Sequence, residues 1–199
     1  MDIEKLFERP GDPSNTSPER RILIATLDCI AEQGLEGATV RVIAAKAGLN
    51  AAAVNYYYRS KEKLVDAALR HAWIHVSEDI DRIAVETSGG REGLETAIAF
   101  LIEGAHRYPT IIRAIVVEHP SLRREAAAFF KRLFEELCAR AGATADPGIG
   151  TTLLLAFSSF IGLAPEAVAA LTGRNPADPA ARRALAAEVV PMIFPTRRA

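Results

Sequence analysis

The sequence contains few of the residues that usually build catalytic, metal or redox sites. Two cysteines, Cys29 and Cys138, lie far apart in a chain of 199 residues and match no zinc or CxxC spacing. Because both fall within apolar helical patterns, we expect buried, unreactive thiols. The four histidines and the carboxylates form no nucleophile–base pair, paired-carboxylate site or phosphate-binding loop at a working spacing. The sequence therefore predicts a protein that is not an enzyme and that has neither a metal site nor a cofactor.

Long apolar runs and a large excess of charge are also missing. No apolar run reaches the roughly 18 residues that a membrane-spanning helix needs. The segment 1–17 lacks the long apolar stretch of a secretory signal. We therefore expect a cytoplasmic protein with no membrane partner. The formal net charge is −1 at pH 7, so any nucleic-acid site must depend on local charge.

Apolar residues recur at helical spacing along most of the chain, and no run of alternating β-branched residues competes with them. The fold class is therefore predicted to be all-α. Ser17, Thr39 and Asn50 stand where N-caps are expected, and Gly48 stands where a helix ends. Pro165 lies inside an apolar pattern, which predicts a kink or a break between residues 162 and 166. The expected helices are 17–34, 39–47, 51–58, 60–86, 92–107, 109–118, 121–141, 147–172 and 179–194.

The composition divides the chain into three parts. Residues 1–16 combine charge with proline, glycine and small polar residues, which is typical of a flexible arm. Residues 17–73 form the expected N-terminal domain, and residues 74–199 the expected C-terminal helical domain, whose regulatory and dimerisation role is implied only by the resemblance described below. The clearest interior break is the Thr-Ser-Gly-Gly segment at 87–90, which falls after the long fourth helix that joins the two domains.

The segment 39–64, TVRVIAAKAGLNAAAVNYYYRSKEKL, is the most informative part of the chain. Its pattern predicts a short amphipathic helix, a turn at Gly48, a second short helix and the start of a third. That order is a helix-turn-helix, which places its second helix in the DNA major groove. From residue 37 to residue 63 there are five basic residues against one acid, Glu62. Local positive charge of this kind suits phosphate contacts, although a solvated helical face has the same composition.

In this segment the chain resembles the TetR/AcrR family of bacterial transcriptional regulators. The resemblance covers residues 17 to 73 and is carried by Thr39, Arg41, Ile43, Ala44, Ala47, Gly48, Leu49, Asn50, Val54, Tyr58, Ser60, Lys61, Glu62 and Leu64. It implies an N-terminal three-helix DNA-binding domain joined by a long fourth helix to a helical ligand-binding domain. It also implies that the positions of Arg41, Tyr57 and Lys61 contact the DNA backbone or groove edges. The positions of Ala51, Ala52 and Asn55 then face bases or nearby phosphates.

The expected DNA-binding residues are those on the outer side of this segment. They are Thr39, Arg41, Asn50, Ala51, Ala52, Asn55, Tyr56, Tyr57 and Lys61. The run 51–53 is all alanine, and an alanine methyl group contacts a thymine methyl but makes no bidentate hydrogen bond with a base. Readout is therefore expected to depend on Arg41, the asparagines, the tyrosines and DNA shape. Arg20 and Arg21 lie close to the arm and within reach of a minor groove, but the expected role for both is a solvated first helical turn.

The expected partners are a double-stranded DNA operator, a second copy of the chain and an unidentified small-molecule effector. The resemblance implies a homodimer built on the last two long helices, and the apolar segments 153–161 and 189–193 agree with it. It also implies an effector cavity in the C-terminal domain, where alanine-rich helices with phenylalanines favour an apolar or aromatic compound. The residues expected to form it are Trp73, Phe100, His106, Tyr108, His119, Phe129 and Phe157.

The leading hypothesis is thus a sequence-specific transcriptional regulator, an effector-released repressor that binds a palindromic operator as a homodimer. The alternative is an all-helical small-molecule-binding or protein-interaction module with little sequence-specific DNA binding. The alanine run at 51–53 favours this alternative slightly, since the start of the expected DNA-contacting helix 51–58 then has no side-chain hydrogen-bonding groups.

Overall fold

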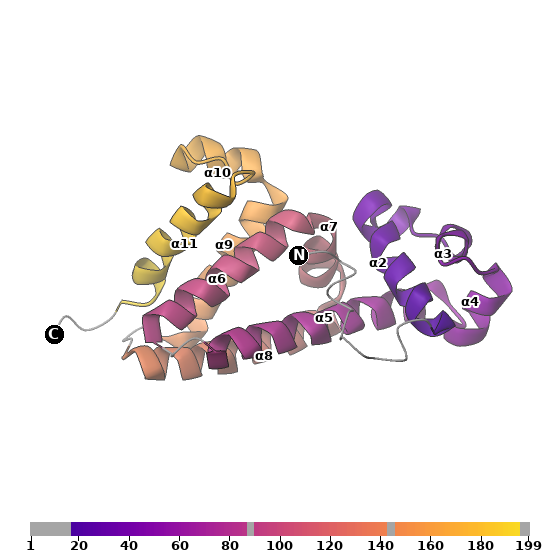
Figure 1. Ribbon diagram of the computed structural model, residues 1–199, viewed down its shortest axis with the longest axis horizontal. Helices are drawn as coiled ribbons and strands as arrows, with labels where there is room; N and C mark the ends of the chain where they lie inside the picture. The colour runs from indigo at the N-terminus through magenta and orange to yellow at the C-terminus, as the bar shows by residue number, and fades with distance from the viewer. Residues whose placement is uncertain (1–16, 87–89, 143–145, 196–199) are drawn as a thin grey trace.

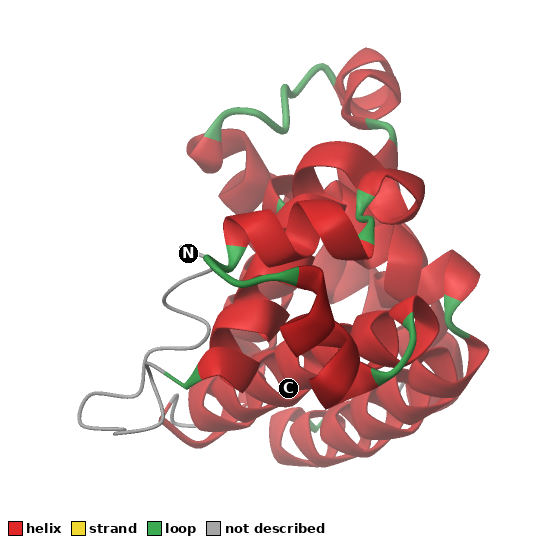
Figure 2. Ribbon diagram, turned by 90° about the vertical axis from the view of Figure 1, so that its right-hand side faces the viewer, coloured by secondary structure: helices red, strands yellow, loops and turns green. Residues whose placement is uncertain are grey.

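A computed structural model of the chain describes residues 17–86, 90–142 and 146–195, and every regular element in these ranges is a helix (Figures 1 and 2). The all-α prediction is confirmed. In chain order the elements are α2 (Pro18–Gly37), α3 (Val40–Lys46), α4 (Ala51–Tyr58), α5 (Lys61–Glu86), α6 (Gly90–Arg107), α7 (Pro109–Arg113), the π-helical turn η2 (Ala114–Glu118), α8 (Pro120–Ala141), α9 (Pro147–Leu163), α10 (Pro165–Thr172) and α11 (Pro179–Ile193).

Side-chain caps fix the starts of the N-terminal helices. The hydroxyl oxygen of Ser17 accepts from Arg20 N at 3.2 Å, and that of Thr39 accepts from Val42 N at 3.3 Å. The amide oxygen of Asn50 accepts from the N–H of Ala53 at 2.8 Å. Each cap satisfies a backbone donor that has no partner within its own helix. The three caps that the sequence predicts are therefore confirmed.

Glycine and proline set the helix breaks. Gly34 has φ +73° and interrupts α2, while Gly48 has φ +67° in the turn after α3. Positive φ costs glycine little because it has no Cβ. Pro165 begins α10, which is bent by 108° from α9, so the predicted break is observed. The segment 109–118 differs from the single helix expected, because it divides into α7 and the π-helical turn η2.

Two clusters of buried apolar side chains hold the helices together. The first joins α2 to α5 and includes Leu27, Ile43, Val54 and Leu64, all fully buried. The second joins the C-terminal helices, and Trp73 packs against both clusters from its position on α5. The long α5 thus connects the head formed by α2, α3 and α4 to the C-terminal bundle (Figure 1). Cys29 and Cys138 are buried, as predicted, and burial raises the pKa of both thiols.

Helices α6 and α9 pack closely in the C-terminal bundle. A Cβ atom placed on Gly162 of α9 lies only 2.3 Å from the backbone oxygen of Ala105 on α6. Nearby, buried Arg182 of α11 donates from Nε to Glu103 of α6 at 2.7 Å and from its guanidinium to the carbonyl of Pro176 at 2.6 Å. These contacts fix α6 between α9 and α11.

No single helix in the described ranges is long and apolar enough to cross a membrane, whereas α9 and α10 together reach that length and composition only as a bent pair.

A pair of histidines on α5 makes the stability of the fold depend on pH. The rings of His71 and His75 are 4.6 Å apart, edge to face. The pKa of His71 is lowered from 6.5 to about 4, mainly by burial and further by the charges of His75 and Arg20, against a smaller opposing effect of Glu78 that is included in this value. Since the folded state favours the neutral ring, the unfolded chain takes up the proton first as the pH falls.

We predict that the free energy of unfolding decreases as the pH falls from 6.5 towards 4. Above pH 6.5 the neutral His71 ring carries no additional proton in either state, so no stability is lost through it. The pKa difference corresponds to a few kcal/mol at most, and roughly 2 kcal/mol is expected after allowance for partial solvent access. The measurement is urea unfolding at several pH values for the wild type and for His71→Gln. The variant should show a flatter dependence in this range, and identical slopes for the two proteins would refute the assignment.

Candidate nucleic-acid interface and ligand cavity

Helices α3 and α4, with the turn at Gly48, form a helix-turn-helix. A few buried side chains and one backbone hydrogen bond hold it in place. Ile43 and Ala44 of α3 and Val54 of α4 are buried against α2 and the start of α5. The N–H of Leu49 donates to Ala44 O at 2.9 Å and closes the turn. The remaining sides of both helices therefore face outward on a rigid base at one end of the molecule (Figure 1).

The outward side of α4 is exposed along its whole length. Ala51, Ala52 and Asn55 are exposed, while Tyr56 and Tyr57 are 81% and 41% exposed. Their rings meet edge to face with centroids 5.5 Å apart. Asn50 and Thr39 are also exposed, although each uses a side-chain oxygen as an N-cap. The structure thus brings the predicted residues of α4 together on one surface.

Tyr58 differs from its two neighbours. It is half-buried, and its hydroxyl has no hydrogen-bond partner within the described residues. Burial is the main cause that raises its pKa above the ordinary tyrosine value. Because the side chain packs against the first cluster, Tyr58 supports α4 and does not belong to the exposed surface.

The basic residues around α4 divide into two groups. Arg41, Arg59 and Lys63 are exposed, and no carboxylate of the described residues lies within ion-pair distance of them. Lys46 instead pairs with Glu32 at 2.5 Å. Arg59 follows α4 with φ +59°, a left-handed conformation that ends the helix. Free guanidinium and ammonium groups beside an exposed helix are the requirement for phosphate contacts.

Lys61 and Arg20 are positioned differently from what the sequence suggests. The ammonium group of Lys61 donates to the carbonyl oxygens of Leu35 at 2.6 Å and Glu36 at 3.3 Å, at the C-terminal end of α2. A cation is favoured there because the last carbonyls of a helix have no partners within it. Arg20 is only 8% exposed, so the solvated first turn expected for it is not observed, whereas Arg21 is exposed.

A cavity of about 320 Å³ lies among α5 and the C-terminal helices, and the head contributes Leu27 of α2 to its lining. Its lining combines residues of α2 and α5 with those of the C-terminal helices and is almost entirely apolar. The lining residues are Leu27, Ala72, Trp73, Val76, Phe100, Leu101, Gly104, Ala105, Tyr108, Ile111, Ile112, Ile115, Val116, Arg123, Ala126, Ala127, Phe130, Leu155, Ala156, Ser158 and Ser159. The volume is near the lower end of the ~300–1,000 Å³ common for ligand pockets.

Three of the residues expected at an effector site, Trp73, Phe100 and Tyr108, line this cavity. The other four are placed elsewhere. The ring of Phe129 packs against Trp73 with centroids 5.4 Å apart, on the side of the hydrophobic core. Phe157 packs against the same core from α9.

The two histidines expected at the effector site are also outside the cavity lining. His106 lies in the last turn of α6, where a cation is favourable beside the final carbonyls. His119 lies before α8 with its Nδ1 3.6 Å from the carboxylate of Asp66. The sequence distinguishes these aromatic residues only by type, whereas helix packing decides which of them faces the cavity.

Residues that the sequence did not indicate complete the cavity. Ser158 is 5% exposed, and its hydroxyl has no hydrogen-bond partner among the described residues. Arg123 is exposed and donates to the carbonyl oxygen of Val116 at 2.7 Å. Leu27 comes from α2 of the head. A serine in an apolar helix and an arginine in a charged helix carry no special pattern, so sequence reasoning had no signal for them.

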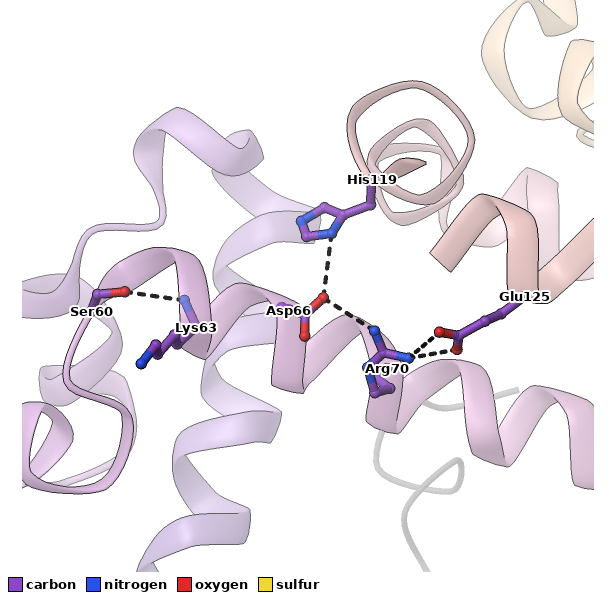
Figure 3. A network of polar contacts seen from close by, with 6 residues as sticks. All are labelled: Ser60, Lys63, Asp66, Arg70, His119 and Glu125. Carbon is purple, nitrogen blue, oxygen red and sulfur yellow. Dashed lines mark hydrogen bonds and ion pairs between the residues drawn. The ribbon is translucent and has the colours of Figure 1, made fainter. Parts of the chain in front are cut away.

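An ionic network joins α5 to the segment beside the cavity (Figure 3). Arg70 of α5 donates to both carboxylate oxygens of Glu125 on α8, at 2.6 and 2.5 Å. Asp66 lies 3.5 Å from Arg70 and 3.6 Å from His119. The hydroxyl of Thr110 on α7 also reaches the carbonyl of Ala31 on α2 at 3.4 Å. The wall of the cavity is therefore linked to the head through polar contacts as well as through Leu27.

Comparison with known proteins agrees with this geometry. Residues 22–68 match the family described as bacterial regulatory proteins, tetR family. The chain is 31% identical over 130 residues to the HTH-type transcriptional regulator BetI of Stenotrophomonas maltophilia (strain R551-3), covering 61% of this chain and 66% of that protein. It is 28% identical over 107 residues to the nucleoid occlusion factor SlmA of Pasteurella multocida (strain Pm70), covering 51% of this chain and 54% of that one. The matches thus span about half to two thirds of these relatives.

Solved structures share the whole fold. The fatty acid degradation regulator FadR from Bacillus halodurans superposes with a TM-score of 0.70 at 16% identity, covering 94% of this chain and 97% of that one. AibR, in complex with isovaleryl coenzyme A and operator DNA, gives 0.67 at 18% identity, covering 91% and 100%. The fold and the helix-turn-helix define a helical regulatory protein with an N-terminal DNA-binding domain. The chain belongs to the TetR family of bacterial regulatory proteins.

Proposed function

We propose that this protein is an effector-controlled transcriptional repressor that binds a palindromic operator as a homodimer. The exposed surface of α4 carries the proposal, since an outward helix on a rigid base suits insertion into the major groove. In this arrangement Asn55, Tyr56 and the alanines at 51 and 52 face base edges. Thr39, Arg41, Asn50 and Tyr57 position the DNA backbone at the groove edges, together with Arg59 and Lys63.

Lys61 has an indirect role in this proposal. Its ammonium group is held by two carbonyls of α2, so it fixes the start of α5 against the head. Among the described basic residues, Arg59 and Lys63 are free for phosphates near α4 on that side. A single copy of this surface offers few charges, and two copies in a dimer double the phosphate contacts.

The surface proposed for dimerisation lies on α9 and α11. Leu153 and Phe160 of α9 are 52% and 44% exposed, and Met192 of α11 is 77% exposed. Other apolar residues of the same helices, such as Leu154 and Val190, are buried in the core. Each helix therefore presents one apolar side to the core and another to solvent, and an exposed apolar patch of this kind supports a protein–protein contact.

We predict that Leu153→Glu converts the dimer to a monomer, because a carboxylate in each copy is buried without a partner at the interface. Dimer affinity should fall at least about tenfold, as measured by sedimentation equilibrium. The matched control is Val117→Glu, which changes a 56% exposed apolar residue of η2 away from this surface. Equal self-association of the two variants would contradict the proposed interface.

The cavity is the proposed effector site. Related folds support an acyl-type compound, since AibR is described with isovaleryl coenzyme A and FadR of Bacillus subtilis with stearoyl-CoA. The volume favours a short acyl chain over a long one. A ligand that contacts Leu27 of α2, Trp73 of α5 and the α8 side of the cavity prefers one position of α5 relative to the bundle. That preference changes DNA affinity by the difference in the ligand's affinity for the two positions.

Selection of bound sequences from random duplex DNA by the full chain tests the function. The expected result is an enriched palindrome whose half-sites lie about one helical turn or a multiple of it apart. Equal, salt-sensitive retention of all sequences would refute sequence-specific regulation. That outcome would favour an all-helical ligand-binding or protein-interaction module, for which the apolar cavity is the supporting observation.

A further inference from the structure

The polar groups of the cavity are few and differ in kind. Among the described residues that line it there is no aspartate or glutamate, and Arg123 is the one charged residue. The guanidinium of Arg123 donates to the carbonyl of Val116, and no carboxylate of the described chain pairs with it. Since it is exposed, its guanidinium lies where the cavity meets solvent. Its remaining N–H donors are therefore available beside an apolar interior.

Ser158 supplies a second polar group inside the cavity. It is 95% buried, and its hydroxyl has no hydrogen-bond partner within the described residues. A buried hydroxyl without a partner is costly, and a ligand that accepts from it or donates to it removes the cost. The nearby walls are apolar: Phe100 and Tyr108 of the α6 region, Phe130 of α8 and Leu155 of α9.

We propose that the cavity binds a small aliphatic or aromatic carboxylic acid, with its carboxylate at Arg123 and its hydrocarbon body against the apolar walls. Ser158 is the specificity-determining residue for a polar atom of the ligand within the cavity. A guanidinium fork binds a carboxylate through two parallel N–H donors, and Arg123 is the one charged side chain among the described lining residues. This inference rests on the proposed function of the cavity as an effector site, and it names the chemical class of the effector.

The volume bounds the size of the acid. At ~30 Å³ for each water-sized group, 320 Å³ holds about ten such groups. Octanoate, with about ten non-hydrogen atoms, is therefore a suitable probe. A coenzyme A thioester shares the acyl chain but has no free carboxylate and places its phosphates outside the cavity. Octanoyl-CoA serves as a separate arm of the test, because it does not need Arg123 to hold a carboxylate.

The experiment is isothermal titration calorimetry of the full chain with octanoate, 1-octanol, octylamine and octanoyl-CoA. Octanoate should bind at least about tenfold more tightly than 1-octanol, and octylamine should give no saturable heat. Arg123→Gln should reduce octanoate binding to the level of 1-octanol. Ser158→Ala should leave octanoate binding unchanged, because the one polar group of octanoate lies at Arg123. The same variant should weaken 8-hydroxyoctanoate, added as a further ligand with a polar atom inside the cavity, about three- to tenfold. Arg124→Gln and Ser77→Ala, at neighbouring residues outside the lining, should bind as the wild type does.

Equal binding of octanoate, 1-octanol and octylamine would overturn the proposal, as would the absence of binding by all of them. If octanoyl-CoA binds more tightly than octanoate, and Arg123→Gln does not change its affinity, the thioester and not the free acid is the effector class. The comparison of ligands on the wild type decides the question even where a variant fails to fold. No DNA is used, so failure here leaves operator binding intact. If the chain binds octanoate in this experiment but selects no DNA sequence from random duplexes, the proposed function as a regulator is refuted and the proposed ligand class is not.

Discussion

Replacement of Gly162 by alanine is expected to lower the free energy of unfolding by about 3 kcal/mol. The new Cβ lies 2.3 Å from the backbone oxygen and 2.8 Å from the backbone carbon of Ala105. Both atoms belong to helix α6, so the contact is relieved only if α6 and α9 move apart. Alanine favours a helix by about 1 kcal/mol relative to glycine, which offsets only part of this cost.

Gly104→Ala is the matched control for this change. Gly104 precedes Ala105 on α6, and a Cβ atom there meets no atom within 4 Å. Alanine at this position is expected to stabilise the protein by about 0.5–1 kcal/mol, because it reduces the conformational freedom of the unfolded chain. Urea unfolding of both variants measures the two effects. If Gly162→Ala is as stable as Gly104→Ala, helices α6 and α9 do not approach as the structure has them.

Replacement of Tyr57 by alanine is expected to weaken binding to the selected operator roughly a hundredfold. A hydrogen bond to a charged phosphate contributes about 1.5 kcal/mol, and a dimer loses two copies of it. The ring of Tyr57 also supports the more exposed Tyr56 through their edge-to-face contact. Fluorescence anisotropy with the labelled duplex gives the affinity, and Tyr57→Phe separates the loss of the hydroxyl from the loss of the ring.

Tyr58→Phe is the control for the tyrosine series. The Tyr58 hydroxyl is buried without a partner in the described chain, and the side chain packs inward. Phenylalanine there should keep operator affinity unchanged and leave stability equal or slightly higher. Loss of affinity in Tyr58→Phe equal to that in Tyr57→Ala would show that the tyrosines act through the fold of α4 and not through DNA contact.

Local signals made the secondary structure predictable. Ser17, Thr39 and Asn50 cap helices because short polar side chains satisfy the first backbone donors, and Gly48 and Pro165 interrupt them for equally local reasons. The outward face of α4 follows from helical periodicity once Val54 is assigned to the core. Such features need no knowledge of distant residues.

The cavity was only partly predictable because it depends on contacts between distant helices. Trp73, Phe100 and Tyr108 line it, but Phe129 and Phe157 have the same residue type and pack into the core. Lys61 matched a family position for DNA contact, and its ammonium group instead binds the end of α2, residues far away in sequence. Arg123 and Ser158 gain their chemistry only from the apolar walls around them.

Hydrogen exchange of the full chain with and without the selected duplex tests most directly that α4 is the DNA-reading helix. The proposal predicts new protection of backbone amides in residues 39–42 and 50–63, with little change in α9 and α11. The same duplex with a scrambled sequence should give weaker protection at equal concentration. Protection confined to the C-terminal helices, or equal protection by both duplexes, would contradict the proposal that this surface reads a DNA sequence.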